Sequence, residues 1–281
     1  MPILIRGYNK GIHTLNSAYY PMITHLYTHR RYILKNSSNE LRYRYAGTAI
    51  GIFWNIINPL LEILIYTVVF SQLFTLRSGS SDPRAYVLFL ITGLFPWISF
   101  AEAILHGSRS LIKNRVYLRR LALPPDIFIA MNALTSFYSL LLYFVLIILV
   151  VSVMGNPLGW SLLLLPLIGL LLHGLAFGIT LAIANLQVLI PDVGEVLRAI
   201  VHLWRWTMPI IYTIDIFPEN IQPLFRLNPP YVFIQSIRQI IIEQTLPSPQ
   251  DWALMFAWIA VFLLFGAFVS RKLASDVKDE I

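Results

Sequence analysis

Residues 128–154 read FIAMNALTSFYSLLLYFVLIILVVSVM, an apolar run without a single charged side chain. The short stretch GNPLG follows at 155–159, and a second apolar run extends from Trp160 to Leu186. A helix needs about 20 largely apolar residues to cross the hydrocarbon core of a bilayer. Both runs are long enough, and the glycines and proline between them favour a turn. The stretch therefore predicts two antiparallel transmembrane helices joined by a tight connection.

Further apolar runs of similar length lie on both sides of this hairpin. They are continuous, whereas the strands of a membrane barrel are about 10 residues long and alternate in polarity. The sequence therefore predicts an all-α, polytopic membrane protein with six transmembrane helices. The predicted spans are Ile50–Phe74, Tyr86–Leu105, Phe128–Met154, Trp160–Leu186, Val196–Ile214 and Trp252–Val269.

The composition of the chain agrees with this class. Of its 281 residues, 57% are hydrophobic and only 12% are charged. Average soluble domains carry about 25% charged residues, and disordered chains are polar, so both classes are excluded. The chain has no cysteine, which excludes disulfides, a thiolate nucleophile and cysteine-ligated metal sites.

The distribution of basic residues predicts the orientation of the chain. Most of the 21 lysines and arginines lie before the first span, between the second and third spans, or after the sixth. Such residues are enriched on the cytoplasmic side, so we expect both termini to face the cytoplasm. The three parts would be a cytoplasmic segment 1–45, a transmembrane domain 46–270 and a cytoplasmic tail 271–281. The net charge of +7 is then explained by topology and contact with membrane lipids, and we expect no nucleic acid partner.

Three segments outside the spans have patterns of their own. Pro21–Lys35 is amphipathic and predicts a helix in the headgroup plane; His25 and His29 lack a third ligand, which favours a solvated face over a metal site. The connection His106–Pro125 interleaves apolar and basic residues, as expected either for a charged turn or for a helix that docks a cytoplasmic partner. The external segment Asp215–Asp251 is rich in proline, which predicts short helices at or dipping into the outer leaflet.

Polar residues inside the predicted spans are candidates for function, because they are costly in hydrocarbon. In the first span, a set of amide, acidic and aromatic residues falls within about 120° of one helix face. Aromatic rings and polar groups suit the C–H faces and hydroxyls of a sugar chain, so one interpretation is a polysaccharide pathway. The alternative is a helix–helix interface with hydrogen bonds across it. The set is Asn55, Asn58, Glu62, Tyr66 and Phe70.

The fifth predicted span carries a second polar stripe, Glu195, Arg198, His202 and Arg205, spaced by three, four and three residues. This spacing places the four side chains on one helix face. Such a stripe has to face protein, water or a charged ligand. Arg205 lies deepest and could form an ion pair with Glu62 of the first span.

Motifs for energy conversion are absent from the sequence. There is no G-x-x-x-x-G-K-[ST] phosphate loop, so an ATP-driven process would need a separate subunit. There is also no H-E-x-x-H or G-x-S-x-G motif. We therefore expect no catalytic residues in this chain.

Four groups of residues are specific when their order and spacing are taken together. They are Leu41–Arg44 with Gly51, Trp54 and Asn58–Leu60; Gly93–Trp97; Asn114–Pro124; and Pro209–Tyr212 with Leu227–Pro229 and Arg238. In this combination the chain resembles the permease subunits of ABC exporters for lipid-linked polysaccharides, the O-antigen and teichoic-acid translocation family. The resemblance implies a homodimer with two cytoplasmic ABC ATPase subunits, which would bind ATP and Mg while this chain binds no cofactor or metal. It also implies an undecaprenyl-pyrophosphate-linked glycan as the substrate.

The resemblance extends to individual residues. Arg42 and Arg44, near the cytoplasmic mouth, would meet the lipid pyrophosphate, because guanidinium matches phosphate geometry; an equal alternative is that they only set topology. The connection between the second and third spans would be the family's coupling helix. The residues expected to transmit motion from the ATPase are Leu111, Lys113, Arg115, Arg119 and Arg120.

Other functions share parts of this pattern. A teichoic-acid or capsule exporter, or an ABC exporter of drugs or small lipids, would have the same architecture. A membrane-embedded enzyme acting on lipid-linked sugars would need acid and base groups at one membrane depth. The nearest acidic pairs are Asp192 with Glu195 and Asp215 with Glu219.

Overall fold

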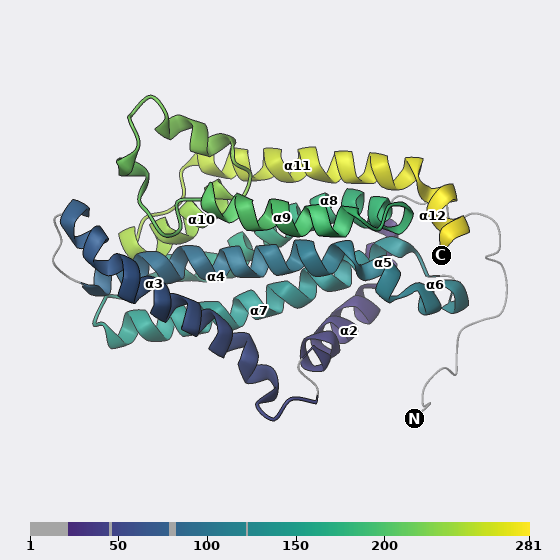
Figure 1. Cartoon of the computed structure of the whole chain (residues 1–281), viewed down its shortest axis with the longest axis horizontal. Helices are drawn as coiled ribbons and strands as arrows, with labels where there is room; N and C mark the ends of the chain where they lie inside the picture. The colour runs from purple at the N-terminus through teal and green to yellow at the C-terminus, as the bar shows by residue number, and fades with distance from the viewer. Residues whose placement is uncertain (1–21, 45–46, 79–82, 122) are drawn as a thin grey trace.

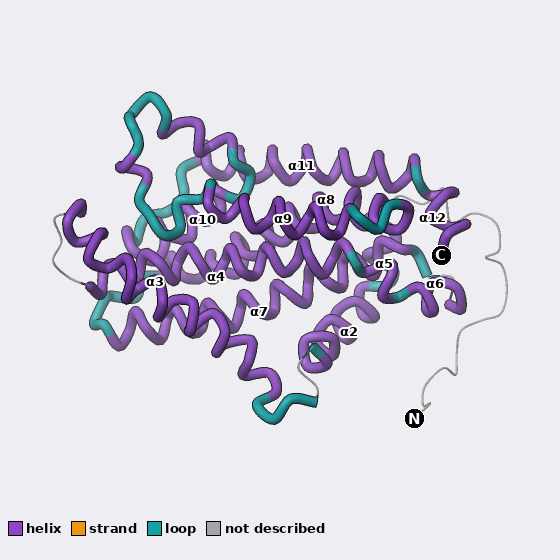
Figure 2. The backbone as a smooth tube through the Cα atoms, viewed as in Figure 1, coloured by secondary structure: helices purple, strands orange, loops and turns teal. Residues whose placement is uncertain are grey.

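The computed structural model describes residues 22–44, 47–78, 83–121 and 123–281. In these ranges the chain forms helices joined by turns, and no strand is assigned (Figure 2). The first 21 residues of the predicted cytoplasmic segment, including the start of the predicted interfacial helix, lie outside the described residues. The all-α prediction is confirmed for the part that the structure describes.

Five of the described helices are long and apolar enough to cross a membrane. They run roughly alongside one another, and α3 diverges from the others toward its N-terminal end (Figure 1). The second, α4, lies at the centre and is the most buried. The five helices are α3 (Trp54–Ser78), α4 (Pro83–Ser108), α7 (Pro125–Val153), α8 (Leu165–Leu189) and α11 (Pro249–Lys272).

The hairpin that the opening stretch predicts is present. Helix α7 ends at Val153, and a short 3-10 helix, η2 (Trp160–Leu164), leads into α8. Gly155 in the connection has a positive φ of 78°, a conformation that only glycine adopts without strain. The two helices then pack antiparallel against each other.

The predicted fifth span differs from the other five: of the six predicted spans, five are confirmed among the described residues as helices long and apolar enough to cross a membrane. Helix α9 (Val193–Trp206) has only 14 residues, about 21 Å of helix, and residues 207–213 form turns and coil. Pro209 causes the break, because it has no N–H to donate and disfavours helical backbone at Met208. The chain still passes between the two ends of the bundle here, partly as helix and partly as irregular backbone.

One end of the bundle gathers the basic segments. It contains α1 (Met22–Thr28), α2 (Arg30–Tyr43), α5 (Ser110–Lys113), α6 (Arg115–Leu121) and α12 (Ala274–Glu280) (Figure 1). A buried cluster joins α5, the start of α7, the end of α8 and α12. The predicted interfacial helix Pro21–Lys35 is divided between α1 and α2, and α2 continues to Tyr43 and packs against α7, so it is a fixed part of the bundle as well as amphipathic.

The opposite end holds the segment between α9 and α11. It contains η3 (Ile214–Ile216), η4 (Gln222–Leu227), α10 (Tyr231–Arg238) and a π-helical turn, η5 (Gln239–Glu243). The expectation of short helices is confirmed. Helix α10 contacts α4, α8 and α11, and most of its side chains are buried, so it packs inside the protein and does not rest on the surface.

Arg238 fastens α10 to the rest of the bundle. Its guanidinium donates to the carbonyl oxygens of Pro209 at 2.7 Å, Phe89 at 3.3 Å and Ile210 at 3.4 Å. A side chain at Gly93 would collide with it, since a Cβ there would lie 2.5 Å from Nη2. Burial lowers the pKa of Arg238 to about 9, so the group remains charged at neutral pH. Two segments that carry the resemblance, Gly93–Trp97 and Pro209–Tyr212, therefore meet at this one side chain.

Candidate functional site

The deepest arginine of the predicted stripe does form an ion pair with the first span. Arg205 on α9 contacts the carboxylate of Glu62 on α3. The Tyr66 hydroxyl donates to the same Glu62 oxygen at 3.2 Å, and the Arg205 guanidinium lies 6.0 Å from the Tyr66 ring centre. The Phe70 ring follows at 6.1 Å from that of Tyr66. These four residues, which we call the α3–α9 cluster, combine opposite charges with two aromatic rings.

The α3–α9 cluster lies at the edge of the bundle. The Arg205 and Glu62 side chains are 19% and 30% exposed, and α3 packs mainly against α4. The neighbouring face of α3 is apolar and open, with Leu64, Ile65 and Val68 all more than half exposed. A partly exposed ion pair beside an apolar face cannot be placed against acyl chains without cost.

The two amides of the predicted pathway do not belong to this cluster. Asn55 is buried, and the hydroxyl of Tyr143 on α7 donates to its backbone oxygen at 2.9 Å and to its side-chain oxygen at 3.3 Å. Asn58 is exposed. The structure thus divides the predicted face of the first span: Asn55 belongs to a helix–helix interface, as the alternative interpretation expects, while Glu62, Tyr66 and Phe70 stay together.

The remaining residues of the stripe lie near the N-terminal end of α9. Glu195 forms an ion pair with Arg198 three residues later. The same carboxylate lies 4.0 Å from Arg109, which precedes α5. His202, between Arg198 and Arg205, is exposed. The stripe is therefore a row of four side chains along one surface of α9, with an ion pair near each end.

Arg42 and Arg44, predicted at the cytoplasmic mouth, have different surroundings. Arg42 is exposed on α2. The Arg44 side chain is only 10% exposed and lies 3.5 Å from Glu102 on α4. Arg44 therefore links the N-terminal helix to the centre of the bundle, and its guanidinium already has an anionic partner.

The segment predicted to couple to an ATPase consists of two short helices, α5 and α6, divided at Asn114. Leu111 is fully buried in the cluster at this end of the bundle, so it anchors the segment and cannot itself contact a partner. Lys113 forms an ion pair with Glu40 of α2. Arg115, Arg119 and Arg120 are exposed.

Two arginines of this segment contact the C-terminal helix. Arg115 donates from Nη2 to the backbone oxygen of Glu280 and from Nε to that of Ile281, the latter at 3.1 Å. Arg119 donates to the same Ile281 oxygen. Helices α6 and α12 thus form one surface at the basic end of the bundle.

The sequence analysis missed the partners of several of these basic residues. Glu40, Glu102 and Asp126 each pair with a group on another helix, the last through His25 Nδ1 at 3.1 Å. Glu102 lies inside an apolar span and Asp126 at the start of one, which is a signal that could have identified these two. In the described ranges, no group of three or more histidines or acidic residues is arranged to hold a metal.

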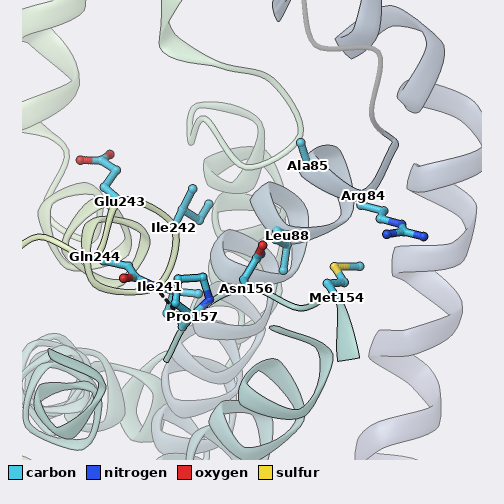
Figure 3. A pocket seen from close by; sticks show the side chains of 10 residues that line it. All are labelled: Arg84, Ala85, Leu88, Met154, Asn156, Pro157, Ile241, Ile242, Glu243 and Gln244. Carbon is cyan, nitrogen blue, oxygen red and sulfur yellow. Dashed lines mark hydrogen bonds between the residues drawn. The ribbon is translucent and has the colours of Figure 1, made fainter. Parts of the chain in front are cut away.

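A cavity of about 530 Å³ opens at the other end of the bundle (Figure 3). It lies among the start of α4, the α7–α8 connection and η5, and the Gln244 side chain donates across it to the Pro157 carbonyl. Glu243 and Arg84 point away from one another in the close view (Figure 3). The cavity is separate from the α3–α9 cluster, and its polar groups do not converge on a common point.

Residues 33–242 match the model of the family described as ABC-2 type transporter. The chain belongs to this family.

Three relatives of this ABC-2 chain match three quarters or more of its length. It is 25% identical over 256 residues to an O-antigen export system permease protein, RfbA, of Myxococcus xanthus, covering 89% of this chain and 96% of the relative. Two proteins of the same name from Klebsiella pneumoniae are 26% and 28% identical, over 84% and 75% of this chain and 90% and 80% of their own lengths.

Membership of the ABC-2 family fits the geometry. The chain is a multi-pass transmembrane transporter subunit, not an enzyme. A partner ATPase is implied by the family. The acidic pairs considered for a membrane-embedded enzyme have other surroundings, since Glu195 is paired with Arg198 and Asp215 and Glu219 are exposed at the opposite end.

Proposed function

We propose that this ABC-2 permease exports a lipid-linked polysaccharide of the O-antigen type across the inner membrane. It would act as a homodimer, with both termini in the cytoplasm and two cytoplasmic ATPase subunits supplying the energy of ATP. The observation that carries the proposal is the full-length similarity to O-antigen export permeases, which leaves no large part of either chain unmatched. The α3–α9 cluster supports it independently, because it supplies the polar and aromatic side chains that a glycan needs.

The position of the cluster supports a dimer with a pathway between the subunits. In a single copy, the Glu62–Arg205 pair lies at the edge of the bundle beside exposed leucine, isoleucine and valine side chains of α3. A second copy against this edge would remove the apolar face from lipid and leave the charged and aromatic groups facing an aqueous passage. The alternative, charges against acyl chains, is the more costly arrangement.

Within such a passage, the rings of Tyr66 and Phe70 would stack on sugar faces. Each contact would be weak, on the order of 1 kcal/mol, and weak contacts suit a polymer that has to slide. The exposed arginines of α6, with Lys113, would form the contact with the ATPase, and Leu111 would transmit its motion into the bundle core.

Export in living cells tests the proposal. The permease and its ATPase are expressed in bacteria that make an O-antigen polymer but lack their own export permease. We expect polymer to reach the surface, and the Tyr66→Ala/Phe70→Ala double variant to reduce export at least fivefold, by loss of about 1 kcal/mol per ring. Phe268→Ala on α11 is the matched control, because that ring is 63% exposed and lies on a helix that packs mainly against α8.

Two outcomes would contradict the proposal. If wild-type protein leaves the polymer inside the cell, the substrate is not a polysaccharide, and an exporter of small lipids or drugs becomes the better interpretation. If the double variant exports like the wild type, the rings do not line the pathway.

A further inference from the structure

The exposed surface of α9 carries three basic side chains in one row. Arg198, His202 and Arg205 are spaced by four and three residues, so they share a face, and the two arginines lie about 10 Å apart along the helix axis. The exposed fraction falls from 49% at Arg198 to 19% at Arg205. The row therefore leads from the basic end of the bundle toward its middle.

Each arginine of the row is held by a single carboxylate. Glu195 holds Arg198, and Glu62 holds Arg205. Arg205 retains unused donor capacity, since its Nε is buried and has no hydrogen-bond partner among the described residues. Guanidinium binds carboxylate and phosphate in the same two-point geometry, so a phosphate group can take the place of either carboxylate.

We infer that Arg198, His202 and Arg205 bind the phosphate groups of a polyprenyl diphosphate lipid. Arg198 receives the phosphates at the basic end, Arg205 holds them deeper, and Glu195 and Glu62 occupy the arginines when no phosphate is present. The inference rests on the proposed function and adds the part of the substrate that this surface recognises. It assigns the phosphate contact to α9, apart from Arg42 and Arg44 at the end of α2.

The same row connects to the α5–α6 segment. Glu195 lies between Arg198 and Arg109, the residue that precedes α5. If α5 moves toward Glu195, Arg109 competes for the carboxylate and Arg198 becomes available to a phosphate. Movement of the α5–α6 segment, which would contact the ATPase, would thereby release Arg198 from Glu195.

Lipid binding to the purified full-length chain tests the inference. The protein is placed in phosphatidylcholine nanodiscs, and the affinity for undecaprenyl diphosphate is measured beside that for undecaprenol, which has no phosphate. We expect Arg198→Gln and Arg205→Gln each to weaken diphosphate binding about tenfold, the loss of one charge-assisted contact. Glu62→Gln and Glu195→Gln should tighten it about threefold, because they release the arginines. Arg226→Gln, an exposed charge at the opposite end, is the matched control and should change nothing.

The opposite signs of the two sets of variants distinguish a binding role from a structural one. Equal losses in Glu62→Gln and Arg205→Gln, or undecaprenol binding as tight as undecaprenyl diphosphate, would overturn the inference. Displacement by excess phosphatidylglycerol would do so too, because the row would then bind ordinary lipid headgroups. If the variants change diphosphate binding as expected but the protein exports no glycan, the proposed function is contradicted and the inference stands. If the protein exports glycan but these variants leave its diphosphate affinity unchanged, the inference is contradicted and the proposed function stands.

Discussion

Arg205 on α9 and Arg238 on α10 show how the surroundings of a side chain determine its role. Arg238 is 4% exposed and bound to neutral carbonyl oxygens, so it acts as a fixed structural link between α10, α4 and the turn after α9. Arg205 is partly exposed and bound to a carboxylate, a partner that a substrate anion can replace. Both residues are arginines, and the identity of the partner separates the structural group from the candidate binding group.

The Glu62–Arg205 pair leads to a prediction at this scale. The single variants Glu62→Arg and Arg205→Glu each place like charges together, so each should lower the melting temperature of the purified protein. The double variant restores opposite charges and should recover most of the loss, with a coupling of about 1 kcal/mol for a partly exposed pair. At this chain length that corresponds to roughly 2–4 °C in melting temperature. A double variant no more stable than either single one would show that the pair does not join α3 to α9.

At the scale of elements, helices differ in how closely they approach. Helices α8 and α11 come into backbone contact, since a Cβ on Gly178 would lie 2.8 Å from the backbone of Phe262 and Leu263, and Gly266 faces Gly178 in the same way. Helix α3, in contrast, packs mainly against α4 and leaves much of its surface open. The first arrangement is suited to rigidity, and the second leaves α3 free to move relative to α9 once their ion pair opens.

Two glycines on α8 provide a matched test of this contact. Gly178→Ala should destabilise the protein by about 1–3 kcal/mol, because the new methyl group forces the two backbones apart. Gly174→Ala, one turn earlier, should be neutral or slightly stabilising, since its methyl group would meet only Ile259 at 3.9 Å and alanine favours the helix. Thermal unfolding of both variants is the measurement. Equal effects would mean that the α8–α11 contact is not as close as the structure describes.

At the scale of the whole molecule, the apolar runs alone predict most of the architecture. Five of the six predicted spans, the hairpin after Val153 and the short helices after α9 follow from the length of each run and from the positions of glycine and proline. What could not be predicted depends on contacts between distant segments: that Asn55 turns to Tyr143, that Arg44 pairs with Glu102, and that Leu111 is buried. The break in α9 was foreseeable from Pro209, but the apolar residues around it outweighed that signal.

Because α9 is short and ends in irregular backbone, the side of the membrane on which each end of the bundle lies is the most informative property to test. Five long helices alone would leave the two termini on opposite sides, whereas passage of the chain through α9 and residues 207–213 returns α12 to the end that holds α5 and α6. The chain has no cysteine, so single cysteines at exposed positions are clean probes: Tyr117→Cys on α6, Ser275→Cys on α12 and Leu224→Cys on η4. With a membrane-impermeant maleimide added to intact spheroplasts, only Leu224→Cys should react, and the other two should react after permeabilisation. Reaction of Ser275→Cys from outside would mean that α9 does not carry the chain across, and the phosphate row on its surface would then lie outside any transport pathway.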